Sequence, residues 1–235
     1  MKHILSGGLI AGLAAGLLCA LLQWWLVEPQ ILLAERYESG ELVHFASALA
    51  EGHDHAVAED HAHVVPEAGG SQIARHLWTV LFSILAYAGY GLLVAGGMVL
   101  AAERGHRVGS AEALLFGLAG FLAFQGLPAV GLAPELPGVL AADLMARQLW
   151  WVGTAASAVV GLWLIGYGRG PVPKLAGIAL LVAPQIVGAP EIEGFAGQIP
   201  PELAARFAAR SLIVGLFAWT TLGLCAGRLL AKPAT

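Results

Sequence analysis

The chain has 235 residues, of which 58% are hydrophobic and only 12% are charged, and its formal net charge at pH 7 is −4. A charged fraction so far below the roughly 25% of soluble domains excludes an ordinary water-soluble protein and indicates a membrane protein. We therefore expect the lipid bilayer, and no nucleic acid, as its surroundings.

Six apolar stretches follow one another along the chain. Four of them, residues 4–27, 77–102, 149–168 and 211–230, have the roughly 20 apolar residues that a helix needs to cross about 30 Å of hydrocarbon. Residues 114–132 reach this length only by running through Pro128, and residues 175–187 are shorter and contain Pro184. Because backbone groups in lipid must be satisfied within their own segment, we expect six transmembrane helices, the two proline-containing ones broken or partly re-entrant.

The same order of two motifs occurs three times along the chain. An apolar stretch ends in a segment that begins with proline, and the next apolar stretch begins with Ala-Arg-x-Leu. The proline-led segments begin at Pro29, Pro128 and Pro184, and the openings begin at Ala74, Ala146 and Ala209. A repeat of this kind sets the architecture. The sequence predicts an all-α integral membrane protein with one membrane domain over residues 1–235. Its six transmembrane helices form three tandem helical hairpins, residues 4–102, 111–168 and 174–230, with pseudo-threefold symmetry.

Charge placement predicts the orientation. The side that would carry both termini and the links between repeats holds seven basic residues, whereas the opposite side holds five basic residues and fourteen of the sixteen acids. The excess of basic residues in cytoplasmic segments puts both termini in the cytoplasm and the three connecting loops outside. We thus predict a multi-pass protein of the bacterial inner membrane, with residues 4–27 as an uncleaved first span, since this run is too long for a signal peptide.

Small residues lie at helical spacing in the first and last spans. Gly8, Gly12 and Gly16 form one such row, and Gly223 and Gly227 form a shorter one. Such rows let a neighbouring helix approach closely, so we predict that they are packing surfaces. The two cysteines, Cys19 and Cys225, lie inside these same spans, where a role in packing is expected and a disulfide is not.

The first outside loop, residues 36–74, carries the strongest chemical signal. Five of the eight histidines fall within twenty residues, beside several carboxylates. The candidate metal ligands are His44, His53, Asp54, His55, Glu59, Asp60, His61 and His63. Imidazole and carboxylate groups suit cobalt, nickel, copper and zinc. We predict loose, exchangeable metal capture that weakens as histidine becomes protonated. The alternative is a solvated loop whose histidines are incidental.

Two glutamines mark a candidate path through the membrane. Gln125 lies just before Pro128, and Gln185 directly follows Pro184. A helix broken at proline frees backbone carbonyls that can coordinate a cation. Alternatively, the glutamines hydrogen-bond across helices. The interior of the confident spans carries no charged residue, which argues against a proton relay within this chain alone.

An acid and an arginine recur near the outer interface of each repeat. The acids are Glu35, Glu135 and Glu191, and the arginines are Arg75, Arg147 and Arg210. One interpretation is three interfacial anchors or ion pairs that tie each hairpin together. The other is a ring of carboxylates around an outer vestibule that concentrates cations.

Several short motifs carry a family resemblance. They are GLAGF at 117–121, FQGLP at 124–128, PELPG at 134–138 and DLMARQLWW at 143–151. With a first span that ends in Val27-Glu28-Pro29 and a His-rich loop behind it, the chain resembles the CbtA family of predicted cobalt transporter subunits over essentially its whole length. The resemblance implies cobalt uptake linked to cobalamin synthesis and a small single-span partner subunit, CbtB.

Three functions stay open from the sequence. The first is a membrane subunit of a divalent-metal uptake transporter, with Co²⁺ as the substrate and Ni²⁺ or Zn²⁺ as alternatives. The second is a non-transporting membrane receptor or assembly factor that binds metal and hands it on, and the third is a structural module. The motifs GxxxxGK(S/T), GxSxG and HExxH do not occur, and the spans leave no room for a catalytic domain, so we expect no enzyme and no tightly bound cofactor. A homo-oligomer stays open.

Overall fold

The computed structural model describes residues 2–42, 72–191 and 199–230, and these residues form helices and no strands. Five helical stretches are long and apolar enough to cross a membrane: Lys2–Glu38, Ile73–Glu103, Ser110–Gly131, Leu144–Tyr167 and Pro201–Leu230. A sixth apolar helix, Pro171–Val187, is shorter. The prediction of an all-α membrane protein is thus confirmed, with five candidate spans and one shorter apolar helix.

Two of the spans contain a π-helical turn. The first consists of α1 (Lys2–Leu22), the π-helical turn η1 (Gln23–Val27) and α2 (Glu28–Glu38). The third consists of α4 (Ser110–Phe121), the π-helical turn η2 (Leu122–Gly126) and α5 (Pro128–Gly131). The remaining helices are α3 (Gln72–Glu103), α6 (Leu144–Tyr167), α7 (Pro171–Val187) and α8 (Pro201–Leu230).

The shorter helix α7 is not broken by its proline. It runs three residues past Pro184 and ends at Gly188, whose φ of 84° is readily adopted only by glycine. Its 17 residues span about 25 Å at 1.5 Å per residue, slightly less than the hydrocarbon core. Neither proline-containing segment is therefore interrupted: α4 continues through η2 into α5, and α7 is continuous but short.

Four helix pairs pack closely, α1 with α3, α4 with α8, α6 with α7 and α1 with α8, and small residues lie at the crossings of the first three. In the pair α1 and α3, a Cβ atom added to Gly12 would lie 2.6 Å from the Cα atom of Ala88. In the pair α4 and α8, a Cβ atom on Gly223 would lie 2.8 Å from the carbonyl oxygen of Ala113. Close backbone approach of this kind drives association in lipid, where burial of apolar surface does not. The predicted packing role of the glycine rows in the first and last spans is confirmed.

These pairings differ from the expected hairpins in the second and third repeats. The first hairpin forms as expected, because α1 packs on α3. In contrast, α4 packs mainly on α8, whereas α6 packs on α7, with Gly161 against Gly177. The pairing within the three repeats is therefore not equivalent. The predicted pseudo-threefold symmetry is not visible in this packing and stays a prediction.

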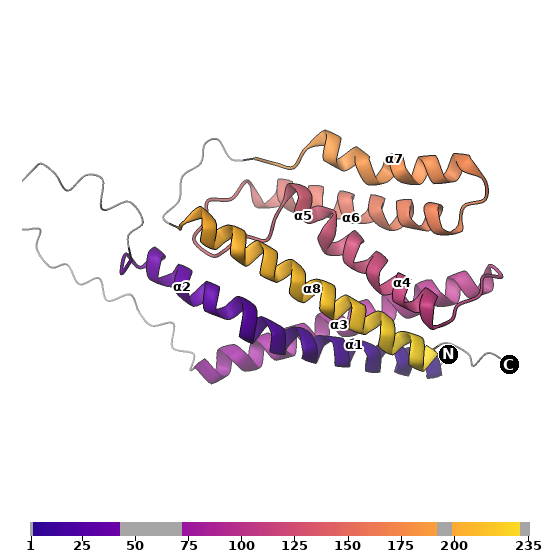
Figure 1. Ribbon diagram of the computed structural model, residues 1–235, viewed down its shortest axis with the longest axis horizontal. Coiled ribbons are helices and arrows are strands. Elements are labelled where there is room, and N and C mark those ends of the chain that lie inside the picture. Colours follow the sequence, from indigo (N-terminus) through magenta and orange to yellow (C-terminus); the bar gives the residue numbers. More distant parts are fainter. Residues whose placement is uncertain (1, 43–71, 192–198, 231–235) are drawn as a thin grey trace, which may run out of the picture.

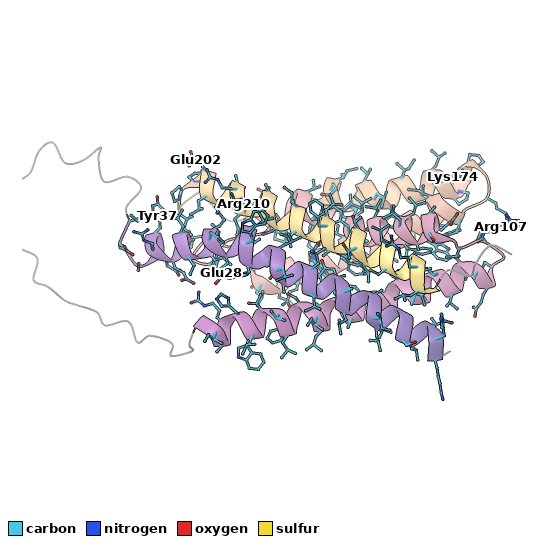
Figure 2. The ribbon with its side chains drawn as sticks, turned by 60° about the horizontal axis from the view of Figure 1, so that its bottom comes forward. Glu28, Tyr37, Arg107, Lys174, Glu202 and Arg210 are labelled. Carbon is cyan, nitrogen blue, oxygen red and sulfur yellow. The ribbon has the colours of Figure 1, made fainter. Side chains whose placement is uncertain are left out.

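Different segments of the chain lie at the two ends of the helix bundle (Figure 1). At one end, here called the turn end, lie the start of α1, the end of α8 and the short connections from α3 to α4 and from α6 to α7 (Figure 1). At the other, the loop end, lie α2, α5 and the start of α8 (Figure 1). Arg107 and Lys174 mark the turn end, and Tyr37 and Glu202 mark the loop end (Figure 2). The chain thus folds with its helix connections at the expected ends, while the side facing the cytoplasm stays a prediction.

Candidate functional site

The two π-helical turns occupy the same register relative to a proline. In each, five π-helical residues are followed by one residue and then by Pro29 or Pro128. The Leu127 amide donates to the Leu122 carbonyl at 2.8 Å, five residues back, in place of the usual four. Because proline has no N–H group, it leaves a backbone carbonyl without its helical partner, and a π-helical turn accommodates this without ending the helix. Sequence reasoning predicted a break here, and only the proline itself signalled the irregularity.

Two side chains from the third repeat donate to carbonyls at these irregular segments. Arg210 Nη1 donates to the Leu26 carbonyl at 3.0 Å, inside η1. Gln185 Nε2 donates to the Leu127 carbonyl at 3.1 Å, directly after η2. Gln185 therefore makes a hydrogen bond between helices, which was the alternative to a role in a cation path. Arg210 and Glu28 both lie in the half of the bundle nearer the loop end (Figure 2).

A cavity of about 1330 Å³ lies between the two π-helical turns, α3, α6 and α8. Its lining extends from Glu135 and Arg147, near the loop end, to Tyr87 and Tyr90 in the middle of α3. Helices α3 and α6 both line it but do not pack closely against each other. The cavity thus gives polar side chains deep in the membrane-spanning region access from the loop end.

Side chains with sulfur, nitrogen and oxygen groups from α1, η1, α3 and η2 lie around the deep part of this cavity. Gln23 Nε2 donates to Cys19 Sγ at 3.3 Å. Tyr87, which is 4% exposed, lies within interaction range of Cys19 and Gln125. Yet within the described part of the chain the Tyr87 hydroxyl and Gln125 Oε1 have no hydrogen-bond partner of good geometry. An unpaired buried polar group costs about 1–3 kcal/mol, so its presence here needs an explanation.

Aromatic side chains bound the inner end of the cavity. Tyr90 and Phe124 line it, and Trp219, which is 1% exposed, lies behind them. The ring centroids of Tyr90 and Trp219 are 4.6 Å apart, and the Phe124 and Trp219 rings are nearly parallel at 5.8 Å. The cavity therefore ends at a packed aromatic cluster about halfway along the bundle.

The three outer carboxylates do not share one environment. Glu35 accepts from Arg75 Nη1 at 3.3 Å, and Glu135 pairs with Arg147. Both pairs are partly exposed, so each contributes about 1 kcal/mol or less. Of the three acids, only Glu135 lines the cavity.

The third repeat departs from this pattern. Glu191 is exposed and makes no ion pair with any residue that the structure describes. Its expected partner, Arg210, donates to a backbone carbonyl instead. In the first and second repeats the geometry matches the ion-pair interpretation. The ring of three carboxylates stays a prediction.

A histidine that sequence reasoning did not single out lies close to η1. His76 Nδ1 lies 3.4 Å from Glu28 Oε2, and its ring meets Trp24 edge-on at 6.0 Å between centroids. His76, Glu28 and Trp24 all border a smaller pocket of about 500 Å³ between α1 and α3. The sequence did contain one signal for this residue. His76 follows the Ala-Arg pair of the first repeat, at the position where the second and third repeats have Gln148 and Ser211.

Metal ligands of the usual kinds do not cluster in the membrane-spanning region. Within residues 2–42, 72–191 and 199–230, no group of three or more His, Cys, Asp or Glu side chains could hold a metal ion. The eight candidate ligands of the His-rich loop, residues 44–63, lie outside the described residues. Metal capture by that loop therefore stays a prediction.

Comparison with known proteins assigns the chain to a family. No curated protein sequence and no solved structure matches it. A family model described as "Probable cobalt transporter subunit (CbtA)" matches residues 1–231, which is nearly the whole chain. The resemblance of the FQGLP and PELPG motifs is thus confirmed, and the chain belongs to the CbtA family of probable cobalt transporter subunits.

Proposed function

We propose that this chain is the membrane-embedded subunit of a Co²⁺ uptake transporter and that cobalt enters it from the loop end. The observation that carries the proposal is the cavity of about 1330 Å³, which reaches from Glu135 to Tyr87 inside a bundle of apolar helices. A receptor that only captures metal at the surface has no use for so deep a recess, whose mainly apolar lining carries a few polar side chains. Membership of a family of transporter subunits supports this function and no enzymatic one.

The charge distribution supports an orientation with the loop end outside the cell. Six of the eleven basic residues that the structure describes belong to the turn end, which we place in the cytoplasm of a bacterial inner membrane together with both termini. The membrane potential, negative inside, favours entry of a doubly charged ion by about 4.6 kcal/mol per 100 mV, twice the value for one charge. Passive uptake down this potential needs no energy-coupling domain in the chain.

The His-rich loop supplies capture in this account. The eight ligands named above gather Co²⁺ outside and raise its concentration at the cavity mouth, where Glu135 lies. Gln125 belongs to the path beyond, because it lines the cavity, whereas Gln185 does not line it. Glu35 and Glu191 contribute negative charge near the entrance.

The family description names a subunit, so we propose a partner that completes the path. A small single-span subunit of the CbtB kind fits the opening between α3 and α6. These two helices share a cavity without packing together, and large apolar side chains on its border, among them Trp78, Phe82 and Val152, are more than half exposed. A further transmembrane helix would cover them and close the cavity on that side.

The internal repeat remains part of the proposal. The equal register of η1 and η2 before their prolines supports a common origin of the first two repeats. In the third repeat, α7 has no π-helical turn. Gln185 and Arg210 of this repeat donate hydrogen bonds to backbone carbonyls of the second and first repeats.

Labelled Co²⁺ uptake into cells tests the proposal. The chain is expressed alone and with its presumed partner, with and without residues 44–67. We expect uptake above background, reduced at low cobalt when the loop is removed and restored at high cobalt, because the loop only concentrates the ion. Metal binding by the purified protein without uptake in any combination would support the alternative, a receptor or assembly factor.

A further inference from the structure

We propose that the two short connections at the turn end together bind the headgroup of an anionic phospholipid. These connections are residues 104–109, between α3 and α4, and residues 168–170, between α6 and α7. Their arginines, with Lys174 in the first turn of α7, recognise the negative charge of the lipid phosphate. This site is independent of cobalt uptake and of the side of the membrane that the turn end faces.

Ring contacts hold the two connections together. The rings of His106 and Tyr167 lie 4.5 Å apart between centroids, and the ring of Phe116 lies 6.2 Å from the same tyrosine. Arg104 lies 5.5 Å from the centroid of the Trp163 ring, within range of a cation–π interaction. The segment that follows α3 therefore packs on the last turns of α6, and basic residues of both connections lie in one region of the surface.

Three cations of this region have no ionic partner within the described part of the chain. Arg107, Arg169 and Lys174 are exposed, and none of them makes an ion pair with a described residue. Figure 2 shows Arg107 and Lys174 at the same end of the bundle. These side chains are thus available to a ligand from outside the chain.

The acids at the turn end do not offset this charge. Among the described residues of this end, two acids, Glu103 and Glu112, stand against six basic residues. Oε2 of Glu112 accepts a hydrogen bond from the Gly109 amide at 2.8 Å and so caps α4. An anion that approaches this end therefore meets a positively charged surface.

Apolar side chains next to the cations favour a lipid over a soluble anion. Val172 and Leu175, which lie on either side of Lys174 in the sequence, are 74% and 64% exposed. Trp163 and Tyr167 lie at the end of the α6 span, the level at which aromatic side chains meet lipid headgroups. A phospholipid can place its phosphate on the cations and its acyl chains on these apolar side chains, whereas a soluble phosphate gains only the charge contact.

A lipid at this site joins two parts of the bundle that pack loosely on each other. Helices α6 and α7 pack closely together, whereas the contacts of α6 with η2, α4 and α5 are small. Helices α3 and α6 share the large cavity without close packing. A headgroup that contacts Arg107 on one connection and Arg169 on the other links the α6–α7 pair to the rest of the bundle. Lipid binding should therefore stabilise the fold.

Native mass spectrometry of the purified full-length chain in a neutral detergent tests the site. The chain is titrated, without metal, with phosphatidylglycerol, with phosphatidylcholine of the same acyl chains and with inorganic phosphate. Each cation that contacts an anionic lipid strengthens binding by about fivefold, so we expect phosphatidylglycerol to bind at least about tenfold more tightly than phosphatidylcholine. Equal binding of the two lipids would overturn the proposal. Displacement of phosphatidylglycerol by an equal concentration of inorganic phosphate would also overturn it, because a soluble anion would then be the ligand.

Matched variants locate the site on the surface. Arg107→Gln, Arg169→Gln and Lys174→Gln should each weaken the binding of phosphatidylglycerol by about fivefold and leave that of phosphatidylcholine unchanged. Arg169→Lys keeps the charge and should retain most of the affinity. The control Arg206→Gln removes an exposed cation near the start of α8, at the loop end, and should have no effect. If the control weakens binding as much as the three variants do, the lipid responds to overall charge and the site at the turn end is contradicted.

Thermal unfolding in the same detergent tests the link between the two parts of the bundle. Phosphatidylglycerol should raise the thermal midpoint of the parent chain, and the double variant Arg107→Gln/Arg169→Gln should lose most of this rise. Without lipid, the double variant should keep the parent midpoint, because both side chains are exposed. An equal rise in the parent and the double variant would contradict the link. These measurements contain no cobalt, so their failure would leave the proposed uptake function untouched.

Discussion

Individual side chains at the two π-helical turns show how this fold provides hydrogen-bond donors for backbone carbonyls of an irregular helix in lipid. Pro29 and Pro128 remove one amide donor each, and carbonyls near them receive Arg210 and Gln185 from distant helices. In a medium without water such bonds satisfy backbone carbonyls of the irregular segments and tie these segments to distant helices. These contacts join positions 58 and 184 residues apart in sequence, so they could not be derived from the local pattern.

The hydrogen bond from Gln185 makes a prediction at the residue scale. Gln185→Leu should lower the free energy of unfolding by about 0.5–1.5 kcal/mol, because the Leu127 carbonyl loses one of its two donors and keeps only the Val130 amide. Thermal unfolding of the purified protein in detergent measures this. Gln148→Leu is the matched control, since its loss breaks no hydrogen bond between described residues. An equal effect of the two substitutions would rule out this role of Gln185.

The membrane-spanning residues of the candidate site were predicted only in part. Gln125 was recognised from its place before Pro128, and it does line the cavity. Cys19 was interpreted as packing, because its partners Gln23 and Tyr87 become visible only when α1 crosses α3. An isolated cysteine in an apolar run carries no information about such neighbours.

Helix composition determines the packing of the elements more than chain connectivity does. The sequence identified the helices and the glycine rows correctly, because apolar length and small-residue spacing are local properties. It did not identify the pairing of α4 with α8, since that depends on which small-residue faces fit together. The expected breaks at Pro128 and Pro184 were wrong, because a π-helical turn carries the third span through Pro128 and α7 continues for three residues past Pro184.

A prediction at the element scale concerns the crossing of α1 and α3. Gly12→Ala should destabilise the protein by about 1–3 kcal/mol, because the added methyl group meets the backbone of Tyr87 and Ala88. The control Gly96→Ala lies in α3, where nothing lies within 4 Å of the added atom, and should be neutral or stabilising. Thermal midpoints in detergent compare the two variants. A midpoint for Gly12→Ala at or above that of the parent would contradict the close crossing.

At the scale of the whole molecule, the described helices combine an apolar exterior with a recess that reaches the middle of the bundle and carries a few polar side chains on a mainly apolar lining. Large apolar side chains on the outer faces of the spans are exposed, as lipid contact requires. Most of the acids among the described residues belong to segments at the loop end, which supports cation entry there. The recess ends at Tyr90, Phe124 and Trp219, so passage of an ion requires this aromatic cluster to move.

The measurement that tests the central claim most directly is Co²⁺ entry into vesicles that contain the purified chain, alone and with its single-span partner. A cobalt-quenched dye inside reports entry, and an imposed potential, negative inside, provides the driving force. We predict entry that the potential accelerates. Vesicles whose protein binds Co²⁺ but admits none, with or without the partner and at any potential, would contradict transport through this chain.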